Sequence, residues 1–106
     1  MARRRREEAE VRDIARQRVR WLFELADRVF ERDPALADRY VELARLIAMR
    51  VRVRIPRDLR RRFCHSCGCL LKPGVNCRVR LAKRRSPHLA ITCLRCGYVH
   101  RIPYKG

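Results

Sequence analysis

Acidic residues are missing from the second half of this 106-residue chain. All 11 aspartates and glutamates lie at or before Asp58, whereas residues 59–106 contain 12 lysines or arginines. The formal net charge of the whole chain is +17. A surface this basic repels itself unless a polyanion neutralises it, so the composition favours nucleic acid as the partner.

Long apolar segments and a secretory signal are also absent. No stretch approaches the ~20 residues that cross a bilayer, and the charged residues at positions 1–8 are not followed by an apolar run. The basic half has no amphipathic apolar face that would insert into a membrane surface. We therefore expect a soluble, cytoplasmic protein without a membrane partner.

The sequence also lacks a plausible set of catalytic side chains. The basic half has no carboxylate that could hold magnesium or act as a general base. The carboxylates of the first half lie at helix-surface spacings among arginines. The chain by itself is expected to be non-catalytic.

Cysteine, in contrast, is plentiful, and four of the six cysteines form two Cys-x-x-Cys pairs. These are Cys64 with Cys67 and Cys93 with Cys96, each pair followed by a glycine that allows a tight turn. Four thiolates at roughly 2.3 Å from one Zn²⁺ complete a closed tetrahedral shell, which is typical of a structural rather than a catalytic zinc ion. We predict one structural Zn²⁺ per chain.

Other interpretations of the cysteines stay open at this point. Six cysteines also allow a disulfide framework, and a single Cys-x-x-Cys is compatible with redox chemistry. Cys69 and Cys77 are either small buried side chains or alternative ligands that compete for the metal. His65, His88 and His100 lie near the two pairs, where we expect them to be exposed or bonded to the backbone.

The first 50 residues predict two helices that pack as an antiparallel hairpin. Residues 1–10 form a charged segment that we expect to be frayed or ordered only against a partner. Apolar residues from Val11 to Phe30 follow a helical period, as do those from Leu36 to Ile47. Asp33 and Pro34 between them predict the cap and first turn of the second helix.

Large aromatic side chains are more numerous on this hairpin than two helices can cover. They are Trp21, Phe23, Phe30 and Tyr40. All four could be core residues, but the excess favours docking of a partner protein on part of this stripe.

The remaining chain predicts a basic linker over residues 51–63 and a zinc ribbon over 64–106. Residues 51–56 alternate apolar and basic side chains, which favours an extended linker or an edge strand. Within the ribbon we expect strand, turn and strand over 70–76, and a strand with one buried and one charged face over 77–81. Further strands are expected over 88–92 and 98–104. The predicted fold class is therefore α+β, with a helical hairpin followed by three short antiparallel strands.

The basic side chains of the linker and the ribbon are the predicted RNA contacts, and the clusters at 57–62 and 83–85 are expected to form a continuous surface. The residues are Arg52, Arg54, Arg60, Arg61, Arg62, Lys72, Arg78, Arg80, Lys83, Arg84 and Arg85.

This order of parts resembles the archaeal ribonuclease P protein component 4 family, which is related to the eukaryotic nuclear ribonuclease P and MRP zinc-ribbon subunits. An arginine-rich helical pair precedes the motifs that carry the resemblance. They are Val51–Pro56, Arg61–Cys64, Pro73–Asn76, Arg78–Arg80 and Ile91–Gly97. Cys69 and Cys77 depart from the family pattern, in which other small residues stand at these positions.

The resemblance implies a subunit of a ribonucleoprotein endonuclease that removes the 5′ leader from precursor tRNA. In that family the RNA carries catalysis, and this protein pairs with the small barrel of component 1, alongside other ribonuclease P proteins, to support the RNA. Such pairing would account for the aromatic excess. Two other classes remain: a zinc ribbon of ribosomal or transcription type that binds RNA or DNA, and a zinc-dependent hydrolase with an open metal position.

Overall fold

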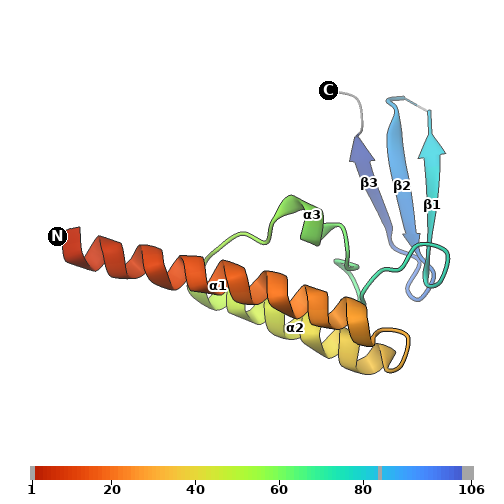
Figure 1. The fold of residues 1–106 in the computed structure, drawn as a ribbon. Helices are drawn as coiled ribbons and strands as arrows, with labels where there is room; N and C mark the ends of the chain where they lie inside the picture. Colours follow the sequence, from red (N-terminus) through yellow and green to blue (C-terminus); the bar gives the residue numbers. More distant parts are fainter. Residues whose placement is uncertain (1, 84, 104–106) are drawn as a thin grey trace. The chain divides into compact units, whose positions relative to one another are not determined.

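The fold combines helices and one small sheet, and the computed structural model describes residues 2–83 and 85–103. Within them lie the helices α1 (Ala2–Val29), α2 (Pro34–Val51) and α3 (Arg57–Arg60), then the strands β1 (Cys77–Ala82), β2 (His88–Cys93) and β3 (Val99–Pro103) (Figure 1). The predicted α+β class is confirmed. The chain divides into two compact units, Met1–Arg61 and Arg62–Gly106. None of the described helices is long and apolar enough to cross a membrane.

The first unit is the predicted hairpin, in which α1 and α2 lie side by side (Figure 1). Its core combines small alanines with larger apolar side chains such as Phe23, and the alanines let the two helix backbones approach closely. The buried residues of the two helices are Ala15, Val19, Leu22, Phe23, Ala26, Ala37, Val41, Ala44 and Ala48.

The connection between the helices is set by the predicted cap. The backbone N–H of Leu36 donates to Asp33 Oδ1 at 3.1 Å, and Pro34 occupies the first turn of α2. The side-chain oxygen thereby satisfies one of the amides that a helix start leaves without a partner. The helix α2 ends at Val51, and the capping residue Arg52 adopts the left-handed conformation with φ 61°.

The expectation of a frayed N-terminal segment is wrong, because α1 already begins at Ala2. Ion pairs one turn apart accompany its first turns, with Arg3 Nε 3.7 Å from Glu7 Oε1 and Arg4 Nε 3.8 Å from Glu8 Oε1. Pairs at this spacing favour a helix, although each contributes little when exposed.

The expectation of an extended linker over residues 51–63 also needs correction. Val51 still belongs to α2, and Arg57–Arg60 forms the helical turn α3. Val53, Leu59 and Phe63 are buried, and residues 53–56, part of the stretch expected as an extended linker or an edge strand, lie in no helix or strand.

The second unit contains an antiparallel sheet in the order β1-β2-β3, as predicted for the ribbon. Residues 70–76 do not form the expected strands; they make two isolated bridges, Phe63 with Leu70 and Pro73 with Cys77, around a turn. The predicted buried face of β1 is also wrong, since Val79 and Leu81 are exposed. The expected last strand ends at Pro103, and Tyr104 lies outside the described residues.

Candidate metal centre and basic surface

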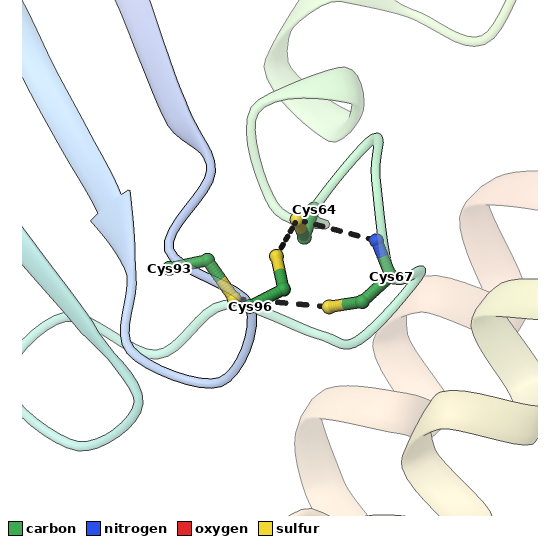
Figure 2. Close-up of side chains that lie close together, drawn as sticks. All are labelled: Cys64, Cys67, Cys93 and Cys96. Atoms are coloured by element: carbon green, nitrogen blue, oxygen red, sulfur yellow. Dashed lines mark hydrogen bonds between the residues drawn. The ribbon is translucent and has the colours of Figure 1, made fainter.

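Four cysteine sulfurs converge at one end of the sheet. The Sγ atoms of Cys64, Cys67, Cys93 and Cys96 all lie within 4.8 Å of one another. The sulfurs of Cys64 and Cys96 are 3.5 Å apart, and those of Cys67 and Cys93 are 3.7 Å apart (Figure 2). These separations exceed the ~2.05 Å of a disulfide bond, and all six cysteines are free thiols. The structure thus brings together the four residues that the sequence predicted as ligands.

The two cysteine pairs sit on nearly identical turns. The N–H of Gly68 donates to the carbonyl of Cys64 at 2.9 Å, and the N–H of Gly97 donates to the carbonyl of Cys93 at 2.8 Å. The two glycines have φ values of 81° and 82°, in the left-handed region that side chains other than glycine rarely adopt. Each turn therefore requires the glycine that follows its second cysteine.

A second backbone hydrogen bond closes each turn in the same way. The N–H of Cys64 donates to the carbonyl of Cys69, and the N–H of Cys93 donates to the carbonyl of Tyr98, both at 2.9 Å. Cys69 and Tyr98 therefore occupy equivalent places in the two turns. We call these turns, residues 64–69 and 93–98, the first and second knuckle.

Burial, backbone amides and neighbouring thiols shift the pKa values of Cys64 and Cys67 in opposite directions. Burial raises the pKa of Cys64 to about 11, although the amides of Cys67 and Ser66 act against it. At Cys67 burial also acts upward, but the Cys69 amide and the neighbouring thiols lower the pKa to about 6. A cation that binds thiolates must displace the proton of Cys64, so metal binding releases protons.

Asn76 supports the centre and was missed by the sequence analysis as a functional residue. The N–H of Lys72 donates to Asn76 Oδ1 and Asn76 Nδ2 donates to the carbonyl of Leu70, each at 2.6 Å. The N–H of Leu94 donates to the backbone carbonyl of Asn76 at 2.9 Å, which ties the turn after the first knuckle to the second knuckle. The sequence signal for this role was the position of Asn76 directly after Pro-Gly-Val, because asparagine side chains often form hydrogen bonds with nearby backbone groups in turns.

The histidines stay outside the cluster of four sulfurs. The exposed His65 stacks on Phe63 with ring centroids 4.8 Å apart, and its ring meets that of His100 edge-on at 5.0 Å. His88 Nδ1 lies 2.8 Å from the carbonyl of Ser86. Burial, and then the nearby His65, lower the pKa of His100.

The predicted RNA contacts are distributed over both units. Most are exposed, Lys72 is half-buried, and Arg84 lies outside the described residues. The exposed ones are Arg52, Arg54, Arg60 and Arg61 of the first unit, and Arg62, Arg78, Arg80, Lys83 and Arg85 of the second. One continuous surface across the two units stays a prediction.

One face of the sheet is basic. In the register of the strands, Arg80 pairs with Ala90 and Ala90 pairs with Arg101, so the two arginines flank a small residue on the same face. Arg78 lies two residues away on that face, opposite Thr92. Arg101 is exposed and was missed by the sequence analysis, because only the pairing of β3 reveals that it joins Arg78 and Arg80.

The comparison with protein families decides the relationship of the chain. A model of the RNAse P Rpr2/Rpp21/SNM1 subunit domain matches residues 18–97. The chain belongs to this family. Its members in the curated proteins include ribonuclease P protein component 4 of Pyrococcus furiosus, 49% identical over 98 residues that cover 92% of this chain and 84% of the relative. The component 4 protein of Methanopyrus kandleri is 52% identical over 94 residues, covering 89% and 73%.

Solved structures of the family agree. A chain in the cryo-EM structure of archaeal ribonuclease P with mature tRNA matches with a TM-score of 0.80 and 46% identity, covering 85% of this chain and 76% of that one. The structure of Pfu Rpp21 matches with a TM-score of 0.60 and 49% identity, covering 85% and 99%. The expectation of a protein subunit of the ribonuclease P endoribonuclease is confirmed.

The aromatic residues predicted to dock a partner have different environments in this family member. Phe23 is 0% exposed and Phe30 is 7% exposed, so both belong to the hairpin core. Trp21 is 57% exposed, and Tyr40 is half-buried. The docking prediction is corrected for the two phenylalanines and is kept for Trp21 and Tyr40.

Replacement of Asn76 by alanine should destabilise the ribbon by about 1–3 kcal/mol, because it leaves the Lys72 amide and the Leu70 carbonyl without their partner. Hydrogen exchange of the β1–β3 amides in the metal-loaded protein measures this effect. Asn76→Asp, which keeps the acceptor and loses the donor, should fall between alanine and wild type, and Val75→Ala is the control at an exposed neighbour. Equal protection in Asn76→Ala and Val75→Ala would contradict the supporting role.

Proposed function

We propose that this subunit holds one structural Zn²⁺ between its knuckles, binds the catalytic RNA of ribonuclease P through the arginines of the ribbon and the segment before it, and docks a partner protein on the hairpin. It thereby supports the removal of the 5′ leader from precursor tRNA in the cytoplasm. The observation that carries the proposal is the convergence of four cysteine sulfurs within 4.8 Å in the half of the chain that has no acidic residue.

The geometry of the cysteine cluster supports zinc. A Zn–S distance of 2.3 Å places the corners of a tetrahedron about 3.8 Å apart, close to the 3.5 Å and 3.7 Å separations of the two sulfur pairs. Cys64, Cys67, Cys93 and Cys96 would fill all four positions, so no position stays open for water. A closed coordination shell argues against a zinc-dependent hydrolase, which needs an open position, and favours a purely structural ion.

The basic residues support RNA as the ligand of the ribbon. Arg78, Arg80 and Arg101 share one face of the sheet, and the register places only the small side chain of Ala90 between Arg80 and Arg101. Guanidinium groups bind phosphate oxygens bidentately, and no carboxylate of residues 59–106 competes for them. The contacts are therefore proposed to be made mainly to the RNA backbone, with Arg101 added to the predicted residues. The solved relative that contains mature tRNA supports an RNA-bound role.

An exposed apolar stripe on α1 supports the docking of a partner protein. Val11, Ile14 and Trp21 are all more than half exposed. Their spacing of three and seven residues places them on one side of the helix. We propose that ribonuclease P protein component 1 covers this stripe, because exposed tryptophan surrounded by aliphatic side chains is typical of interface hot spots.

Removal of zinc should unfold the ribbon and leave the hairpin helical. Zinc binding in small modules is worth ~10–16 kcal/mol and serves as folding energy, whereas the hairpin has an apolar core of its own. A strong chelator should abolish the protection of the β1–β3 amides and retain the helical circular-dichroism signal. Cys93→Ser should act like the chelator. Strand protection that survives metal removal would contradict the structural role.

Replacing Arg60, Arg61 and Arg62 together with glutamine should weaken binding to ribonuclease P RNA. Each lost phosphate contact reduces the salt slope of binding by about 0.7–0.9, so the slope should flatten by about two to three. Titrations at several salt concentrations measure both effects. A glutamine triple at the exposed Arg16, Arg28 and Arg32 removes the same charge from the hairpin and serves as control.

If the two triple variants show the same RNA affinity and the same salt slope, residues 60–62 do not contact the RNA. A duplex DNA of matched length tests whether the ribbon prefers RNA. Equal affinity of the wild type for that DNA would show that the arginines bind phosphates without selecting ribonuclease P RNA.

Trp21→Ala should weaken binding to component 1 by about thirtyfold or more, because truncation of a central tryptophan typically costs about 2 kcal/mol or more. Calorimetric titration of the two purified proteins measures the change. Met49→Ala removes an apolar side chain that is also exposed but lies on α2 outside the stripe, and it should bind as the wild type does. If both variants bind equally well, the stripe is not the docking site.

A further inference from the structure

A fifth thiol lies beside the four proposed ligands. The Sγ atom of Cys69 is 3.3 Å from that of Cys67 and 3.7 Å from that of Cys93. Cys69 is 2% exposed, whereas Cys67 is exposed. The proposed functions use four sulfurs and leave this one without a role.

The equivalent place in the second knuckle is occupied differently. Cys69 and Tyr98 both accept the closing hydrogen bond of their knuckle through their carbonyls. Tyr98 is 47% exposed, and its ring meets His100 edge-on at a centroid distance of 4.6 Å. The turn itself therefore does not require an inward thiol at this place, and the cluster of sulfurs is asymmetric, with three from the first knuckle and two from the second.

The distances make Cys69 comparable with Cys67 as a partner of Cys93. The Cys69 and Cys67 sulfurs both lie 3.7 Å from that of Cys93, close to the roughly 3.8 Å edge of a zinc–thiolate tetrahedron. Five sulfurs exceed the four positions of such an ion, and Cys69 is not one of the four thiols that all lie within 4.8 Å of one another. Ligation by Cys69 thus needs Cys67 to leave the shell and the Cys69 sulfur to move toward its place.

We propose that Cys69 is a reserve ligand that replaces Cys67 when the Cys67 thiolate is lost. The inference rests on the proposed zinc centre and adds to it a fifth residue. In the exchange the Cys69 thiol gives its proton to solvent and binds the ion as thiolate, so the shell keeps four sulfurs. Because Cys67 is the exposed ligand of the first knuckle, it is the one that electrophiles reach, and the buried Cys69 preserves the centre when Cys67 is modified.

Cobalt substitution of the full chain tests the exchange. The intensity of the thiolate-to-Co²⁺ charge-transfer band reports the number of bound thiolates, and elemental analysis gives the metal content per chain. Cys67→Ser should keep one ion per chain and the full wild-type intensity. Cys67→Ser combined with Cys69→Ala should lose about a quarter of the intensity, as expected for three of four thiolates, or lose the ion.

Cys96→Ser is the matched control, because Cys96 is also the exposed second cysteine of its knuckle but has Tyr98 in place of a nearby thiol. It should lose intensity as the double variant does. Cys69→Ala alone should match the wild type, since all four primary ligands remain.

A Cys67→Ser variant that loses intensity, metal or folding to the same extent as Cys96→Ser would overturn the inference while leaving the four-thiolate centre intact in the wild type. A wild-type chain that shows no four-thiolate spectrum would overturn the proposed zinc centre itself. The two failures are therefore distinguishable.

Discussion

The convergence of four cysteine sulfurs is the constraint on which the second unit depends. Its buried cluster consists of Cys64, Cys69, Cys77 and Cys93 with a single leucine, Leu71, and Ile91 packs against it. Thiols supply little of the apolar surface whose burial stabilises a domain of this size, and adjacent thiolates repel one another. A cation bound between the knuckles would turn this repulsion into attraction. The sheet borders this cluster at the end where Cys77 pairs with Cys93.

The first unit is stabilised by an ordinary apolar core, and this contrast fits the proposed division of roles between the two units. Phe23, Val41 and five alanines bury an apolar interface between α1 and α2 that needs no ion. The polar termini are satisfied locally, as by Asp33 at the start of α2. Because the hairpin has a core of its own, an additional apolar face of α1 can bind another protein. The ribbon buries its few apolar groups around the cysteines, and its exposed surface is mainly basic.

Local patterns in the sequence predicted those features that depend on neighbours along the chain. The Asp33-Pro34 boundary, the two knuckles with their glycines and the three antiparallel strands belong to this group. Features that depend on what covers a face were not predictable in the same way. The alternation of apolar and basic residues around Val79 is the same whether that face of the strand is covered or exposed. Helical spacing likewise does not distinguish the buried Phe23 from the exposed Trp21. The role of Arg101 could be recognised only from the register of β3, and that of Asn76 only from the path of the backbone around it.

The separation into two compact units has a consequence for the order in which a ribonucleoprotein forms. With the proposed zinc centre, the hairpin would be able to fold during synthesis before any ion is bound, and so could meet a protein partner early. The ribbon would acquire its sheet only when its cysteines bind the ion, and its arginines would be ordered from that point. Metal supply would then control the step from protein–protein assembly to RNA binding. A subunit without its ion would already be bound to its protein partner but could not yet bind the RNA.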